Sequence, residues 1–166
     1  PEPFLHANHN ESKNNNRLAL NIAPDYLLIG ATGRLAEQKD MATLIRAVPF
    51  LKALLPDRPF LLLLAGDGPE RAQLEALTHS LEISSYVRFL GFYTDIPGFL
   101  AALDIFVSSS LWEGLSISIM EAMASALPIV TTNILPNAEL IEHEVTGLLV
   151  PPKSPEAIAQ AIKRFI

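Results

Sequence analysis

Two cations and two carboxylates are the residues of this sequence whose types and spacing could do chemistry. Arg34 and Lys39 follow a glycine-containing loop, and Glu113 and Glu121 lie on either side of Gly114-Leu115-Ser116, which is typical of a loop-to-helix junction. Arg side chains fork onto phosphate oxygens, and Lys adds a mobile point charge. A helix N-terminus near that junction would offer free amides and a positive dipole end. Together these groups suit a diphosphate.

Each group also has an alternative role that needs no ligand. Arg34 and Lys39 could be solvated loop cations. Ser118-x-x-Glu121 has the spacing of a capping box, in which the carboxylate only closes the start of a helix. Glu113 lies in a loop beside a tryptophan, where a capping role is less natural. Because carboxylates accept hydrogen bonds from sugar and ribose hydroxyls, an acid pair beside an anion site suits a nucleotide-sugar, and both interpretations stay open at this point.

Composition narrows the classes of protein. The sequence has 166 residues, 49% of them hydrophobic, which suffices for one domain with a real core. The absence of Cys excludes disulfides, thiolate metal sites and a Cys nucleophile. A net charge of −6 argues against a nucleic-acid partner. His6 and His9 lack a nearby third ligand, so we expect surface histidines and no metal site. We expect a cytoplasmic protein, with peripheral contact at the inner face of a membrane left open.

Strands and helices alternate along the chain. Apolar runs predict strands over 26–29, 60–65, 87–91, 104–107, 129–132 and 147–150. Helical patterns occupy the intervals, beginning at an Asp40 cap, at Pro69, at 95–97, at about Ser116, over 139–143 and after a Ser154 cap, with one or two turns possible over 14–20. This alternation predicts an α/β fold: a single Rossmann-like, doubly wound parallel sheet of about six strands with helices on both faces. Residues 1–13 are interpreted as a linker or terminal segment, and 14–166 as the domain.

Ligands of open α/β sheets bind beyond the carboxyl ends of the strands. The cations, the acid pair and several glycines all follow predicted strands. The candidates placed there include Gly33, Arg34, Lys39, Gly66, Leu90, Ser110, Glu113, Gly114 and Ser116.

Five segments, in this order, resemble the group 1 (family 4) retaining glycosyltransferases of GT-B architecture, specifically their C-terminal donor domain. They are Gly33-Arg34-Leu35 with Lys39, Gly66-Asp67-Gly68-Pro69-Glu70, Val87-Arg88-Phe89-Leu90-Gly91, the E-x7-E-A-M-A signature from Glu113 to Ala124, and Thr146-Gly147-Leu148-Leu149-Val150. The resemblance covers about residues 12–166. It implies a nucleotide-sugar-binding half of an enzyme whose N-terminal acceptor domain and final C-terminal helix lie outside this sequence.

The resemblance also implies roles for individual residues. Arg34 and Lys39 would hold the donor diphosphate, and Glu113 the hydroxyls of the transferred sugar; these three are the implied catalytic residues. Glu121 would bind the ribose. The remaining implied substrate contacts are Gly33, Gly66, Leu90 near the base, and Gly114, Leu115, Ser116, Ile117 and Ser118 near the sugar and phosphates. The family needs no metal or other cofactor, and a UDP- or GDP-linked sugar would be the donor.

The sequence departs from the family pattern at two single positions and in one short segment. Ala126 and Asp40 stand where glycine is usual, and Leu135-Pro136-Asn137 stands where the family often has a Gly-Gly pair. The last departure motivates an alternative hypothesis, in which the chain is a degenerate, non-catalytic module acting in assembly or regulation. The presence of Arg34 and Lys39 together with the acid pair favours the enzyme half, which by itself is expected to bind nucleotide without transferring sugar.

Overall fold

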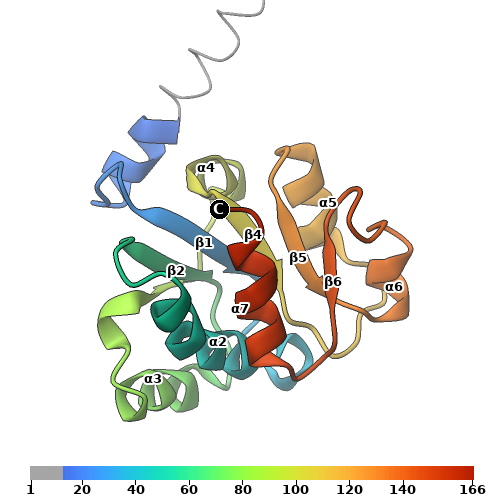
Figure 1. The fold of residues 1–166 in the computed structure, drawn as a ribbon, viewed down its shortest axis with the longest axis horizontal. Helices are drawn as coiled ribbons and strands as arrows, with labels where there is room; N and C mark the ends of the chain where they lie inside the picture. Colours follow the sequence, from blue (N-terminus) through green and yellow to red (C-terminus); the bar gives the residue numbers. More distant parts are fainter. Residues whose placement is uncertain (1–12) are drawn as a thin grey trace, which may run out of the picture.

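As predicted, six parallel strands form a single sheet (Figure 1). The strand order is β3-β2-β1-β4-β5-β6. The computed structural model describes residues 13–166, so His6, His9 and the predicted terminal segment up to residue 12 lie outside the described residues. The strands are β1 (Leu27–Thr32), β2 (Phe60–Ala65), β3 (Val87–Gly91), β4 (Ile105–Ser108), β5 (Ile129–Thr132) and β6 (Leu148–Val150).

Helices cover both faces of the sheet. The helices are α2 (Met41–Leu54), α3 (Arg71–Ser80), α4 (Ile96–Ala102), α5 (Ile117–Ala124), α6 (Leu135–Ala138) and α7 (Pro155–Lys163), with a further helix over 13–19 and 3-10 turns η1 (Glu37–Lys39) and η2 (Ser84–Tyr86). Buried side chains of α2, α3 and α7 belong to one core cluster, and those of α4 and α5 to the other. None of the helices within 13–166 is long and apolar enough to cross a membrane.

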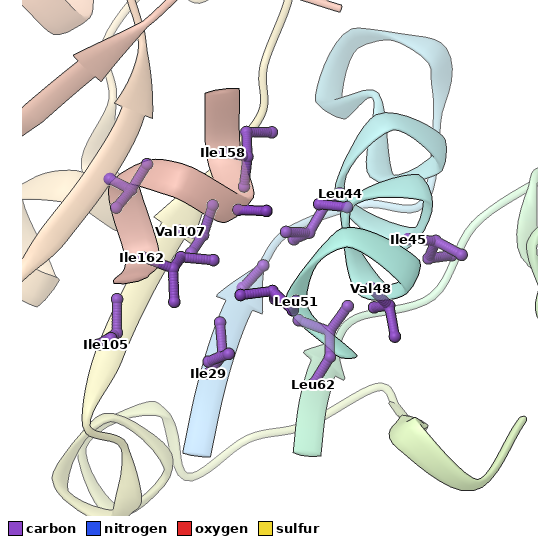
Figure 2. Packing of buried hydrophobic residues seen from close by; sticks show 14 of the residues in the cluster. Ile29, Leu44, Ile45, Val48, Leu51, Leu62, Ile105, Val107, Ile158 and Ile162 are labelled. Atoms are coloured by element: carbon purple, nitrogen blue, oxygen red, sulfur yellow. The ribbon is translucent and has the colours of Figure 1, made fainter. Parts of the chain in front are cut away.

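Successive residues of each strand supply the two cores in turn. Ile29 and Leu62 face α2 and α7, whereas Leu28 and Leu63 face α4 and α5. Figure 2 shows the first of these cores, in which Leu44 and Leu51 of α2 and Ile158 and Ile162 of α7 pack over the strands. Burial on both faces explains why the strands read as continuous apolar runs.

The first strand is longer than predicted. We expected it to end at Ile29, with a loop from Gly30, but it continues to Thr32. Gly30 pairs with Leu63 on one side and Phe106 on the other. A Cβ at this position would lie 2.4 Å from Leu103 Cδ1, so glycine is what lets the strand pass over this part of the core.

Two helices begin elsewhere than predicted. α3 starts at Arg71, not Pro69, because the Glu70 amide donates to the Leu35 carbonyl at 3.0 Å and holds this turn outside the helix. The helix predicted over 139–143 is wrong: α6 lies at Leu135–Ala138, where Pro136 occupies the first turn that its fixed φ favours. The chain after α6 turns back towards β6.

Candidate functional site

The strand order creates a crevice between the carboxyl ends of β1 and β4. These neighbours pair directly, but the chain leaves β1 towards β2 on one side and leaves β4 towards β5 on the other. The connections that follow the two strands therefore lead towards opposite edges of the sheet, and ligands of doubly wound folds bind at such a switch point. Residues 33–39 form one wall and residues 109–116 the other. This arrangement brings Lys39 and Glu113 into contact, whereas Arg34, in the same loop as Lys39, borders a hollow on the β2 side.

Hydrogen bonds join the two walls directly. The Leu111 amide donates to the Gln38 carbonyl at 2.8 Å, and Ser109 Oγ donates to the Lys39 carbonyl at 2.8 Å. Gln38 Nε2 in turn donates to the Trp112 carbonyl at 3.0 Å. The position of the Glu113 loop is thus fixed by η1.

Glu113 is the most tightly held acid of the crevice. Its Oε1 accepts from Lys39 Nζ at 2.5 Å and from Ser110 Oγ at 2.7 Å. Its Oε2 accepts from Gln38 Nε2 at 3.1 Å. The side chain is only 6% exposed. A carboxylate offers about four acceptor positions, so one remains for a further hydroxyl.

Arg34, unlike Lys39, has no ion-pair partner within 13–166. Its side chain is exposed. It borders a hollow of about 380 Å³ beyond the carboxyl ends of β1 and β2. The other residues lining this hollow are Thr32, Gly33, Ala65, Gly66, Asp67, Phe92, Tyr93 and Ile96. The Asp67 carboxylate accepts from the Gly68 amide at 2.7 Å and pairs with Arg71 at 3.4 Å. An exposed guanidinium beside a partly aromatic hollow can bind an anion whose remainder is flat and apolar.

Gly33 and Gly66 let two loops meet at this hollow. Gly66 has a φ of +150°, and its amide donates to the Gly91 carbonyl at 2.8 Å. A Cβ on Gly66 would lie 1.9 Å from the Gly33 carbonyl oxygen. The first requirement for glycine here is therefore backbone packing. Leu90, just before Gly91, is half-buried against the core on the α4 side.

α5 begins four positions after Glu113. Ser116 is its N-cap residue, and Gly114, Leu115 and Ile117 are exposed. The Ile117 amide donates to the Leu115 carbonyl at 3.0 Å, whereas within 13–166 no backbone acceptor contacts the Ser118 amide. Amides without intrahelical partners and the helix dipole favour an anion at this end.

The capping-box explanation for Glu121 is wrong. A capping box needs the acid three positions after the N-cap residue, but the N-cap residue is Ser116 and Glu121 lies five positions later. The side chain of Glu121 is exposed on α5, and Ser118 lies inside the helix. Glu121 therefore keeps a carboxylate free to contact a ligand.

Gln38 and Ser110 both donate hydrogen bonds to the Glu113 carboxylate, and neither contact was predicted from the sequence. Ser110 was among the residues expected at the strand ends, but its bond to Glu113 was not anticipated. Gln38 was missed altogether. The one available signal was an amide side chain next to Lys39 in a loop at a strand end.

An open parallel sheet with helices on both faces is shared by several classes of α/β protein, and comparison with solved structures identifies the class here. The structure superposes on a crystal structure of HepE of Anabaena in complex with UDP and glucose with a TM-score of 0.83 and 28% identity, covering 93% of this chain and 42% of that one. The family profile "Glycosyl transferases group 1" matches residues 27–166. The chain therefore belongs to the group 1 glycosyltransferases, as the five motifs indicated.

Relatives of known sequence agree with this family. The chain is 35% identical over 158 residues to an uncharacterized glycosyltransferase, MJ1607, of Methanocaldococcus jannaschii, covering 94% of this chain and 40% of the relative. It is 35% identical over 150 residues to the lipopolysaccharide core biosynthesis glycosyltransferase LpsE of Rhizobium meliloti, covering 90% and 42%. The chain thus spans about 40% of the length of the relatives it matches.

Proposed function

We propose that this chain is the donor-binding domain of a retaining glycosyltransferase. The enzyme would transfer a sugar from a UDP- or GDP-linked donor to a glycan, lipid or small-molecule acceptor. The observation that carries the proposal is the contact between the loops that follow β1 and β4, where Lys39 pairs with Glu113 four positions before α5 begins. Arg34 lies in the same loop after β1 and borders the neighbouring hollow. The UDP in the HepE complex supports a nucleoside diphosphate as the ligand.

The diphosphate would be held by the two cations and α5. Arg34 offers a guanidinium that no acid of 13–166 neutralises, which suits bidentate contact with phosphate oxygens. Lys39 already shares its charge with Glu113, so its net contribution to an anion is smaller. As the bond to the sugar breaks, negative charge grows on the leaving diphosphate. Fixed cations and amides that face this charge stabilise the transition state without a metal ion.

The sugar and nucleoside would be bound by the remaining groups. The acceptor position left on Glu113 suits a hydroxyl of the transferred sugar. The exposed carboxylate of Glu121 suits the ribose hydroxyls, and backbone groups near Leu90 the base. Amides from Gly114 to Ser118, apart from the occupied Ile117 amide, would contact the sugar and phosphates.

We propose that an N-terminal domain of the full-length protein binds the acceptor. This agrees with the chain spanning about 40% of its relatives. The present chain should therefore bind donor nucleotide and transfer nothing. Calorimetric titration with UDP, GDP and ADP tests the binding, and an assay with UDP-glucose tests the transfer. A folded chain that binds none of the three would contradict the donor site. Transfer of sugar by this chain alone would contradict the proposal that a second domain is needed.

The alternative, a degenerate module without catalysis, rests on Leu135-Pro136-Asn137. Substitutions in the full-length protein separate the two functions. In an enzyme, Arg34→Ala and Glu121→Ala each lower transferase activity steeply, because each removes a donor contact. In a non-catalytic module neither substitution changes nucleotide binding.

A further inference from the structure

Asn137, in the segment that departs from the family pattern, is fully buried. Its side chain is 0% exposed. Its Oδ1 accepts from Ser116 Oγ at 2.5 Å. Its Nδ2 donates to Thr131 Oγ1 at 2.8 Å and to the Thr132 carbonyl at 3.1 Å. Since both ends of the amide are engaged and no surface is exposed, this side chain is not placed to touch a ligand.

The same hydrogen-bond network continues to Glu113. Thr132 Oγ1 donates to the Ser110 carbonyl at 2.6 Å, and Ser110 Oγ donates to Glu113 Oε1 at 2.7 Å. Ser110, Ser116 and Thr132 are each at most 1% exposed. Every buried side-chain polar atom of 13–166 has a partner. Buried networks that are fully satisfied hold their members in one arrangement.

From these contacts we infer that Asn137 is a positioning residue for the diphosphate site. It holds Ser116, the N-cap residue of α5, against the end of β5, and thereby sets where the amides at the start of α5 point. The inference rests on the proposed function, in which those amides contact the phosphates. The inference also gives Leu135-Pro136-Asn137 a structural role. The buried side chain of Asn137 links this segment to Ser116 and to the end of β5 without touching the donor.

The substitution Asn137→Asp keeps the shape of the side chain and removes its two donors. It also puts a carboxylate beside Ser116, at the positive end of α5, where it competes with a phosphate. We expect the affinity for UDP to fall at least tenfold, while the affinity for uridine, which has no phosphate, changes less than twofold. Calorimetry with both ligands measures the ratio; GDP and guanosine replace them if the wild type prefers guanine.

Asn133→Asp is the matched control for charge. Asn133 lies four positions earlier, between β5 and α6, is exposed, and its side chain hydrogen-bonds no residue of 13–166. The same charge change there should alter the UDP-to-uridine ratio less than threefold. If Asn133→Asp lowers this ratio as much as Asn137→Asp, repulsion between charges explains both and the positioning role is refuted.

Ser116→Ala tests the same link without any new charge, and it decides the matter if Asn137→Asp does not fold. The loss of one oxygen should lower UDP affinity several-fold and leave uridine affinity unchanged. Amide hydrogen exchange at Ile119 and Met120, whose amides donate to the Ser116 carbonyl, should become faster. Folded variants that keep the wild-type affinity ratio, or that lose both ligands equally, would overturn the inference. A wild-type chain that binds no nucleoside diphosphate would instead refute the proposed function.

Discussion

Lys39 and Glu113 lie 74 positions apart in the sequence and meet with their charged atoms at 2.5 Å. Both side chains are largely buried, with exposures of 17% and 6%. Removing one partner of a largely buried ion pair lowers the stability of the fold, because the other charge is left buried without compensation. The pair therefore serves the fold of the crevice as well as any ligand.

Lys39→Met tests this dependence. The substitution leaves the Glu113 carboxylate with only its Ser110 and Gln38 donors, so the free energy of unfolding should fall by about 1–3 kcal/mol. Urea denaturation measures the loss. In the double variant Lys39→Met/Glu113→Gln, no buried charge remains, and part of the loss should be recovered. Strictly additive effects of the two substitutions would show that the pair is not coupled.

Gly66→Ala tests the close contact of the two glycine loops. The new Cβ would lie 1.9 Å from the Gly33 carbonyl oxygen, in a backbone conformation with φ of +150°. Overpacking of this kind costs about 1–3 kcal/mol, and the positive φ adds to it. Gly114→Ala is the control, since a Cβ there meets no atom within 4 Å. Equal unfolding free energies for the two variants would contradict the packing account.

The sequence predicted which residues lie at the site better than it predicted the hydrogen bonds between them. That Arg34, Lys39 and Glu113 follow strands could be read from the sequence. The Gln38–Glu113 and Ser116–Asn137 hydrogen bonds could not be predicted. They join residues 75 and 21 positions apart, respectively, and the proximity of these residues depends on the strand order. Spacing also suggested a local capping partner for Glu121, and the helix starting at Ser116 excludes it.

At the scale of elements, α5 ends with a residue in an unfavourable conformation. Ala126 has a φ of +54°. Its amide donates to the Met123 carbonyl at 2.9 Å, and the Leu127 amide donates to the Ala122 carbonyl at 3.1 Å. These two bonds define a Schellman motif, whose left-handed position glycine fills most readily. The departure from the family glycine at this position therefore costs stability.

Ala126→Gly should stabilise the protein. Removing the Cβ relieves the left-handed strain, which outweighs the greater freedom of glycine in the unfolded chain, and the expected gain is about 0.5–1 kcal/mol. Ala124→Gly, at the exposed last residue of the same helix, should lower the stability by at most about 1 kcal/mol. Thermal denaturation of both variants checks the opposite signs. A loss of stability in Ala126→Gly would contradict this reading of the helix end.

Helices and strands with strong apolar patterns were predicted closely. Those whose bounds depend on the contacts of a single residue, such as Gly30 or Pro136, were not. The strand at Phe60–Ala65 and the Asp40 cap, whose carboxylate accepts from the Thr43 amide, are as expected. The extension of β1 through Gly30 depends on the room that glycine leaves for Leu103. α6 lies four residues before the predicted helix, because Pro136 starts it and the burial of Asn137 holds it there. Periodicity carries none of this tertiary information.

For the whole molecule, an ionic contact at the amino end of β4 attaches the 13–19 helix to the sheet. Asp104 accepts from Lys13 Nζ at 2.7 Å, from Arg17 Nη2 at 2.7 Å and from the Leu28 amide at 2.7 Å. Burial alone would raise the pKa of Asp104, but the hydrogen bonds from Lys13 and Leu28 and the two positive charges lower it below its usual value. This contact lies at the end of the sheet opposite the crevice.

Asp104→Asn should lower stability in a pH-dependent way. Because the folded-state pKa of Asp104 is depressed, its stabilising effect is complete above the unfolded-state pKa of about 3.9 and is lost as the pH falls through the folded-state value. The variant should be about 1–3 kcal/mol less stable than the wild type at pH 7, and this difference should shrink below about pH 4.

Urea denaturation across this pH range measures the effect. Asp25→Asn, an exposed acid that pairs with no cation of 13–166, is the control and should leave the curve unchanged. A stability difference for Asp104→Asn that stays constant from pH 7 to pH 3 would show that the contact is not ionic.

The most direct test of the proposed donor site is a calorimetric titration of UDP, GDP and ADP into the wild-type chain, Arg34→Ala and Arg46→Ala. Arg46 is also an exposed arginine, but it lies on α2 beside a different groove. The crevice between β1 and β4 predicts saturable binding of at least one diphosphate to the wild type. It also predicts at least a tenfold loss of affinity in Arg34→Ala and no change in Arg46→Ala. Absence of binding to the folded wild type, or equal binding by the Arg34 variant, would contradict it.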